Sequence, residues 1–304
     1  LRYITSPNMA ISDGRNHAPS IDNDLRGMLS MSPFSSRCCQ HNHGMGWPYY
    51  AEHLVMATTD GGLATMLYSA SETTALVGDH QQVKLIEETN YPFEEEVRLT
   101  LQTTTPVSFP LYLRIPAWAK GASININGEL QSVEAVTGAY IRIQRQWSDG
   151  DQLTLSLPMS ISTRVWQKNR SSLSVNYGPL TLSLKIDERY NQRDSRDHEI
   201  VQDDSHWQAG VDASLWPAYE IFANSDWNYT LDVDDALQPV DLSMERRTWP
   251  ANDFPFTPDA VPLVFKASGH QVPSWGFDQT GMTAPLPTQF VPRSAAPTPL
   301  QLRS

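Results

Sequence analysis

The chain of 304 residues is long enough for one large domain or two, and it can bury a substantial hydrophobic core. Its formal net charge of -12 and sequence pI near 5.0 oppose binding to a nucleic-acid phosphate backbone. Its composition, with 40% hydrophobic residues, 22 prolines and 16 glycines, indicates a folded, turn-rich and mostly β protein, and no apolar run approaches the ~20 residues of a membrane span.

Residues 1–46 contain Gly, Asn, Ser and Pro with little periodicity, which predicts an irregular loop. The chain begins LRYITSPNMA, without an initiating Met, and we expect a fragment or a processed form. Trp47 and Pro48 open a stretch, WPYYAEHLVMAT, that predicts a short helix, because proline suits the first turn. The following TTDGG segment is expected to end this helix at about residue 60.

Between Leu63 and Asp187, apolar residues alternate with polar ones, which predicts half-buried antiparallel strands. The alternating sets are Val97, Leu99 and Leu101; Leu111, Leu113 and Ile115; Ile124 and Ile126; Ile141 and Ile143; and Leu153, Leu155 and Leu157. Asn127-Gly128 suits a type I′ hairpin turn, and Ser148 to Asp151 predicts a second tight reversal. Many short strands separated by turns favour an antiparallel β-sandwich over residues 63–187.

After Glu188 the alternation is lost in a polar, charged stretch, NQRDSRDHEIVQDDS, which predicts an exposed loop or linker. Short apolar segments separated by prolines follow it to the end of the chain. We therefore expect three regions, residues 1–62, the sandwich of 63–187, and a loop-rich second β region at 188–304 that is truncated at its end.

The only two cysteines, Cys38 and Cys39, are adjacent, and His41, Asn42 and His43 follow closely. Adjacent cysteines close only a strained ring, so free thiols or metal-bound thiolates are expected instead of a disulfide. Thiolate and imidazole are ligands that zinc prefers, but this spacing matches no common zinc-finger pattern. The residues alone favour two buried structural thiols with surface histidines, and a metal site would need ligands from elsewhere.

A nucleophilic cysteine is the other interpretation of the pair, because a metal, a cation or a helix N-terminus can stabilise a reactive thiolate. Arg37 precedes the pair, and the expected helix begins about nine residues after it. Neither is close enough in sequence to establish activation. The surroundings of the pair lack the signature of papain-like proteases.

A two-carboxyl glycosidase site, in which one acid protonates the leaving group, would require two suitably placed acidic residues. The candidates are Glu52, Glu87, Glu88 and the run Glu94-Glu95-Glu96. All of them stand where the solvated face of a helix or strand is expected.

Tryptophans can stack on sugars, and this chain has nine. Trp118, Trp147 and Trp166 lie at the ends of predicted strands, where packing in the core or at a sheet edge is the favoured interpretation. Asn169 and Asn228 begin glycosylation sequons, which occur commonly by chance.

Several segments, in this order along the chain, resemble glycoside hydrolase family 127, the β-L-arabinofuranosidase-like proteins. They are RCCQHN, GGLATMLYSAS, ETNYPFEEEVRLTL, FPLYLRIPAWAKGASININGE, YIRIQRQWSDGDQLTLSLPM and NYGPLTLSL. The resemblance covers residues 20–187 strongly and the part from WNYTL onward more loosely. A vicinal cysteine pair followed by LRIPAWA, NG, W-x-x-GD and GPL makes the resemblance specific.

The resemblance implies a catalytic (α/α)6 helical barrel followed by β-sandwich domains. Residues 1–62 would then be the last part of the barrel, most of which is missing from this chain. The implied activity is retaining hydrolysis of plant-type or related glycans by a zinc-bound cysteine nucleophile. Cys38 would be the nucleophile, Cys38 and Cys39 would bind zinc, and His41, Asn42 and His43 would contact the substrate.

In the family, a Glu and a Cys that complete the zinc shell, and the glutamate acid/base, lie upstream of the cysteine pair. We therefore expect this chain to be inactive by itself. The rival interpretations are a non-catalytic, carbohydrate-associated β-sandwich with inert thiols and a redox sensor that uses both cysteines. The expected partner is a carbohydrate, the oligomeric state is open, and polysaccharide-degrading relatives suggest a periplasmic or extracellular location by analogy only.

Overall fold

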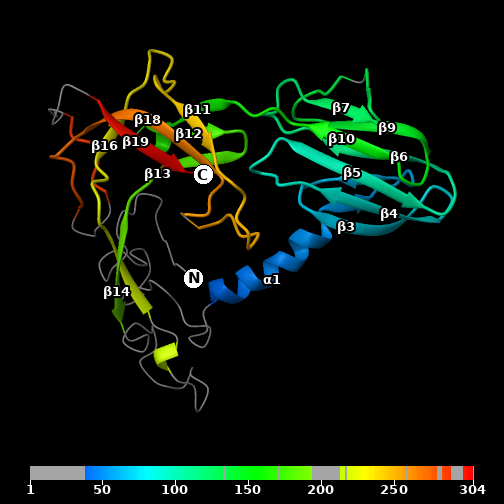
Figure 1. Cartoon of the computed structure of the whole chain (residues 1–304), viewed down its shortest axis with the longest axis horizontal. Coiled ribbons are helices and arrows are strands. Elements are labelled where there is room, and N and C mark those ends of the chain that lie inside the picture. Colours follow the sequence, from blue (N-terminus) through cyan, green and yellow to red (C-terminus); the bar gives the residue numbers. More distant parts are fainter. Residues whose placement is uncertain are drawn as a thin grey trace. The chain divides into compact units, whose positions relative to one another are not determined.

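The computed structural model describes residues 38–132, 134–169, 171–193, 213–215, 218–257, 259–278, 283–288 and 297–303. The chain divides into two compact units. The sandwich unit is Met45–Leu182, and the split unit consists of Leu1–Gly44 and Ser183–Ser304. Strands predominate in the described residues, and nearly all of them pair antiparallel, which confirms the predicted fold class (Figure 1). None of the described helices is both long and apolar enough to cross a membrane.

The elements follow one another in chain order. They are α1 (Cys38–Glu52), β1 (Val55–Ala57), β2 (Leu63–Thr65), β3 (Ser71–Val77), β4 (Gln81–Glu88), β5 (Glu96–Thr103), β6 (Val107–Arg114), β7 (Ser123–Ile126), β8 (Glu129–Leu130), β9 (Tyr140–Trp147), β10 (Gln152–Ser156), β11 (Ile161–Trp166), η1 (Gln167–Asn169), β12 (Ser172–Tyr177), β13 (Leu180–Leu184), β14 (Glu188–Arg193), η4 (Ala213–Leu215), β15 (Ala218–Ala223), β16 (Tyr229–Leu231), β17 (Ser243–Arg246), β18 (Leu263–Gln271) and β19 (Thr298–Arg303).

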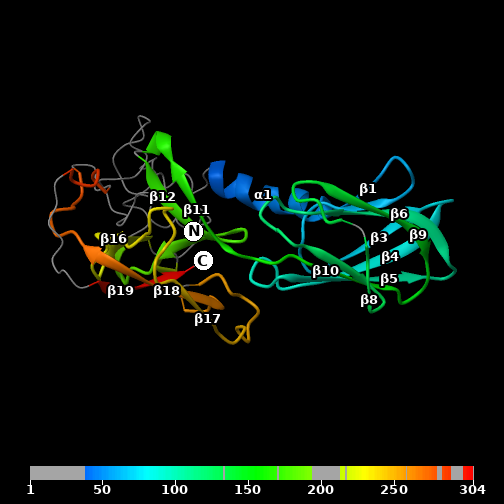
Figure 2. The ribbon, with the colours of Figure 1, turned by 90° about the horizontal axis from the view of Figure 1, so that it is seen from above.

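The core of the sandwich unit lies between two sheets (Figure 2). One sheet has the order β1-β2-β6-β9 and the other has the order β3-β4-β5-β10-β7-β8. The last strands of the unit lie outside these two sheets, with β12 paired to β11 and β13. The pair β2 and β6 is parallel, which is the exception to the antiparallel pattern in the described sheets. The core takes buried residues from both sheets, including Leu99 of β5 and Leu111 of β6.

The predicted alternation is confirmed in this core, because every residue of the five alternating sets is buried. Trp147 is only 2% exposed, and its indole N–H donates to the carbonyl oxygen of Phe109 at 3.0 Å. Trp118 is half-buried against the same core. The structural interpretation of these two tryptophans is therefore confirmed.

The two predicted turns are also present. Asn127 and Gly128 have φ values of 52° and 89° between β7 and β8, as a type I′ turn requires. At the second reversal, the Ser148 amide donates to the carboxylate of Asp151 at 2.9 Å. This reversal does not make a hairpin, because β9 and β10 belong to different sheets.

The helix prediction was wrong at both ends. α1 begins at Cys38 instead of Trp47 and ends at Glu52 instead of about residue 60. Gly44 and Gly46 lie in its first part, and their low helix propensity favoured the loop prediction for that part. Pro48, which was expected in the first turn, lies inside the helix. At the other end, Val55–Ala57 leaves the helical pattern because β1 pairs with β2.

In the split unit, β18 is the central strand. It pairs with β16, β17 and β19, and β19 in turn pairs with the last two residues of β13. Leu263, Val264 and Phe265 of β18 are each 1% exposed or less. This unit therefore has buried apolar residues of its own.

Strands β14 and β15 form a separate two-stranded ribbon in the split unit. The ribbon corrects one prediction, because Asn191–Arg193 belong to β14 although the polar stretch from Asn191 was expected to be a loop. A ribbon that is partly open to solvent tolerates such polar residues, so polarity did not reveal the strand. The rest of that polar stretch lies outside the described residues.

Candidate functional site

The predicted catalytic segment coincides with the start of α1, where Cys38 and Cys39 are the first two residues. The side chains of Cys38, Cys39, His41 and His43 lie outside the described residues, whereas Asn42 is exposed on the helix. The predicted nucleophile, zinc ligands and substrate contacts therefore remain predictions. In the described parts of the chain, no group of three or more His, Cys, Asp or Glu residues is placed to hold a metal ion.

Large apolar side chains follow the cysteines along α1. Met45, Trp47 and Tyr49 are 58%, 58% and 66% exposed. Trp47 also packs edge-to-face against Tyr50, with ring centroids 5.8 Å apart. The sequence indicated a helix here but not that these side chains would stay exposed.

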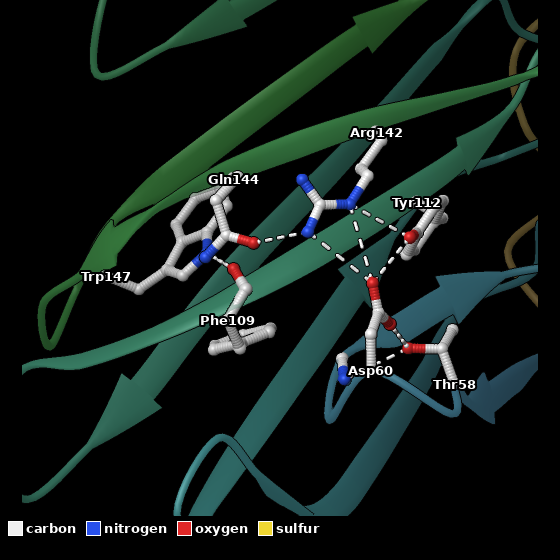
Figure 3. Close-up of polar contacts among 8 residues, drawn as sticks. Thr58, Asp60, Phe109, Tyr112, Arg142, Gln144 and Trp147 are labelled. Atoms are coloured by element: carbon white, nitrogen blue, oxygen red, sulfur yellow. Dashed lines mark hydrogen bonds and ion pairs between the residues drawn. The ribbon is translucent and has the colours of Figure 1, made fainter.

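A polar cluster lies on the sheet β1-β2-β6-β9, around Asp60 in the turn between β1 and β2 (Figure 3). The Asp60 carboxylate accepts hydrogen bonds from the Thr58 hydroxyl at 2.5 Å and from the Tyr112 hydroxyl at 2.7 Å. Arg142 lies 3.5 Å from the same carboxylate and donates to the Tyr112 hydroxyl at 2.9 Å. Tyr112 and Arg142 meet because they are register partners on β6 and β9.

The electrostatics of this cluster favour a charged Asp60. Hydrogen bonds from Thr58 and then from Tyr112 hold the pKa of Asp60 below its usual range. An acid held in its ionised form cannot supply a proton to a leaving group near neutral pH. Asp60 instead links the turn at residues 58–62 to the sheet through its contact with Tyr112. Within that turn, the Gly62 amide donates to the Thr58 hydroxyl at 3.0 Å.

Glu87 corrects the expectation that every candidate acid occupies a solvated face. It is 2% exposed on β4, and burial raises its pKa to about 8. Its Oε1 accepts from the Ser69 amide at 2.8 Å, whereas its Oε2 is buried without a partner among the described residues. A pKa in this range suits a general acid, but a carboxyl group enclosed in a sheet interior cannot reach a substrate.

Glu95 also has a structural position, because its carboxylate accepts from the Met159 amide at 2.9 Å and from the Tyr177 hydroxyl at 3.2 Å. Glu52, Glu88, Glu94 and Glu96 are exposed, as predicted. The described geometry thus gives none of the six acids the surroundings of a catalytic carboxyl group.

Trp166 and the Asn228 sequon are the remaining sequence features, and they differ in how exposed they are. Trp166 is 43% exposed at the end of β11, and the Arg164 guanidinium lies 3.7 Å from its ring centroid. Asn228 is half-buried, and its side-chain amide donates to the carbonyl oxygens of Val272 at 2.9 Å and Trp275 at 3.3 Å. The Asn228 side chain therefore has a structural role, because its amide nitrogen already makes hydrogen bonds within the protein.

Comparisons with known proteins point to one family. Residues 62–159, which span β2 to β10, match the family described as "Beta-L-arabinofuranosidase, GH127 middle domain". A search of curated proteins finds no match.

Two solved structures share the fold. One is a GH127 β-L-arabinofuranosidase, Ara127N-Se, from Geobacillus stearothermophilus T6, with 22% identity and a TM-score of 0.55 over 88% of this chain. The other is described as a glycoside hydrolase, with 18% identity and a TM-score of 0.60 over 95% of this chain. This chain covers 34% of the first protein and 40% of the second, so it spans well under half the length of either.

Proposed function

We propose that this chain is part of a glycoside hydrolase of family 127 acting on β-L-arabinofuranosides or related glycans, because its residues 62–159 match the middle domain of that family. One observation carries the proposal to specific residues. The vicinal pair Cys38-Cys39 opens α1, and α1 leads within ten residues of its end into the matched domain.

The start of a helix is a favourable position for a nucleophilic thiolate. The first backbone N–H groups of α1 have no partner within the helix, and the helix dipole places partial positive charge there. Both effects stabilise a negative charge on sulfur. Because α1 starts at Cys38 and not nine residues later, this support applies directly to the cysteine pair.

The donor set fits zinc. Two thiolates and two imidazoles occur within residues 38–43, and these are the ligands that Zn²⁺ prefers. We assign Cys38 and Cys39 as ligands, with the remaining ligands supplied from elsewhere in the protein. When bound, zinc would keep the thiols deprotonated at neutral pH.

In the reaction we propose, the Cys38 sulfur attacks the anomeric carbon, and the carbon–sulfur bond forms as the glycosidic carbon–oxygen bond breaks. The leaving oxygen takes a proton from a general acid that is none of the six glutamates discussed above. Water then displaces the sulfur and gives up its proton to the same group acting as a base. Two displacements retain the anomeric configuration. We assign His41, Asn42 and His43 to substrate contacts.

Serine substitution of each cysteine in the full-length parent protein tests the proposal. We expect Cys38→Ser to lower kcat/KM for an aryl β-L-arabinofuranoside by about 10³-fold or more, because a serine hydroxyl is a much weaker nucleophile. We expect Cys39→Ser to lower both activity and bound zinc measured by elemental analysis. NMR of the first-formed sugar should show the retained anomer.

Glu52→Gln is the matched control on the same helix, because Glu52 is exposed on the last turn of α1. It should leave kcat/KM unchanged. Unchanged turnover in a folded Cys38→Ser protein would refute the nucleophile assignment. Reversible oxidation of both thiols by peroxide, in a protein without zinc, would instead support the redox-sensor interpretation.

We also propose that the 304-residue chain alone does not turn over substrate, because it spans only 34% of the Geobacillus enzyme whose fold it shares. Turnover of an aryl β-L-arabinofuranoside by the purified chain would contradict this.

A further inference from the structure

The split unit contains a cavity of about 410 Å³ that the proposed function does not use. It is lined by residues of β14 and β15, the segment from Ser225 to Asn228, and the segment from Trp275 to Phe277. Its volume lies within the range of small-molecule sites. Both aromatic and polar side chains line it, which is the usual composition of a ligand pocket.

Three of the aromatic rings that line this cavity contact one another. Trp227 stacks on Phe277, with centroids 4.7 Å apart and planes at 29°. It also meets Trp275 edge-to-face at 5.5 Å. Each of these side chains keeps part of its surface accessible to solvent. The cluster therefore offers a ligand an apolar aromatic surface.

Hydrogen bonds hold this aromatic surface in place. The Trp275 indole N–H donates to the carbonyl oxygen of Ala284 at 2.7 Å. The Asn228 side chain links the Trp227 segment to the backbone of Val272 and Trp275. Rings fixed in this way lose little conformational freedom when a ligand stacks on them.

Polar side chains that can bind hydroxyl groups also line the cavity. The Arg189 guanidinium lies 4.7 Å from the ring centroid of Phe222, its register partner on β15, and donates to Asn191 at 2.5 Å. Asp226 is exposed, and no described residue pairs with its carboxylate. Arginine supplies donors and aspartate supplies acceptors, which together match a ligand with several hydroxyl groups.

We propose that this cavity is a carbohydrate-binding site that holds one neutral sugar ring against Trp227. A sugar ring has an apolar face of C–H groups that stacks on an aromatic plane and an edge of hydroxyl groups for Arg189 and Asp226. One cationic and one anionic side chain, Arg189 and Asp226, line the cavity. This balance of charge is compatible with a neutral ligand. The site does not involve Cys38 and stands independently of the proposed reaction.

A quaternary ammonium ligand fits the same rings less well. Such a cation needs several open ring faces around it, whereas Trp227 and Phe277 cover one face of each other. This alternative makes a different prediction, because tetramethylammonium would then bind and a neutral oligosaccharide would not.

The test is titration of the ¹⁵N-labelled chain with arabino-oligosaccharides, following the indole N–H resonances of Trp227 and Trp275. We expect saturable shifts of these two resonances, and Trp227→Ala should weaken binding by about tenfold or more. Asp226→Ala should weaken it severalfold, and this exposed residue is chosen because its removal disturbs no described contact.

Trp166→Ala is the matched control, because it removes an exposed tryptophan on β11 of the sandwich unit and should leave binding unchanged. Cys38→Ser should also leave it unchanged, which separates this site from the proposed reaction. The proposal would be overturned if no saturable shifts were seen, or if the chain preferred tetramethylammonium. It would also be overturned if the folded Trp227→Ala and Asp226→Ala proteins bound the oligosaccharide as tightly as the unsubstituted chain.

Discussion

Glu87 is a carboxyl group that the fold keeps in an apolar interior. Its register partner on β3 is Ser71, whose hydroxyl oxygen is likewise buried without a partner among the described residues. A protonated Glu87 has a hydroxyl donor on one oxygen, and the residue directly opposite offers an acceptor. The neutral form is thus the one that this position stabilises.

The pH dependence of stability follows from this raised pKa. The unfolded carboxyl group ionises above about pH 4.5, whereas the folded one stays protonated until about pH 8. The contribution of Glu87 to the free energy of unfolding should therefore be most favourable below pH 4.5. It should fall by up to about 1 kcal/mol per pH unit between pH 4.5 and pH 8. Urea unfolding at several pH values measures this slope.

Glu87→Gln should raise stability at pH 7.5 and flatten the slope, because glutamine stays neutral and keeps an acceptor for the Ser69 amide. Glu88→Gln, at the exposed next position on the same strand, is the matched control and should leave the slope unchanged. An unchanged loss of stability with pH in the Glu87→Gln protein would show that the carboxyl group is already ionised in the folded state.

At the scale of elements, the parallel pairing of β2 with β6 depends on a close approach at Gly62. A Cβ atom at this position would lie 2.1 Å from the carbonyl oxygen of Pro110, which is a backbone atom that cannot turn aside. Gly62 immediately precedes β2, so the absent side chain allows the two chain segments to meet.

Gly62→Ala should therefore lower the free energy of unfolding by about 2–4 kcal/mol, because the backbone itself must shift. Gly121→Ala is the comparison, since no atom lies within 4 Å of its added Cβ and only its positive φ of 76° is unfavourable. It should cost about 1 kcal/mol. Equal losses in chemical denaturation would show that the approach at Gly62 relaxes easily.

At the scale of the whole molecule, each compact unit contains buried apolar residues of its own. Leu99 is 1% exposed in the core of the sandwich unit, and Val264 is fully buried in the split unit. Cores that do not share residues can unfold in separate steps.

We expect Leu99→Ala to destabilise the sandwich unit by about 2–5 kcal/mol, because it leaves a cavity in a closed core. Scanning calorimetry should show one transition moving to lower temperature while the other stays in place. Val264→Ala, the matched change in the split unit, should move the other transition. A single transition that shifts with both substitutions would show that the units unfold together.

Sequence alone determined the features that depend on residues close together in the chain. Alternating apolar residues identify the inward faces of strands such as β5 and β9, and Asn127-Gly128 carries the backbone preference of its turn. The family resemblance also came from local motifs, and the match over residues 62–159 supports it. The cysteine pair was identified in the same way, as a residue pattern.

Tertiary structure decided what depends on neighbours distant in the chain. The burial of Glu87 comes from the sheet that covers it, and the parallel pairing of β2 with β6 joins segments far apart in sequence. The aromatic cavity combines Trp227 with Trp275 for the same reason. Periodicity shows which face of a strand is apolar, but the partner of each strand is set by packing between segments that the local pattern does not relate.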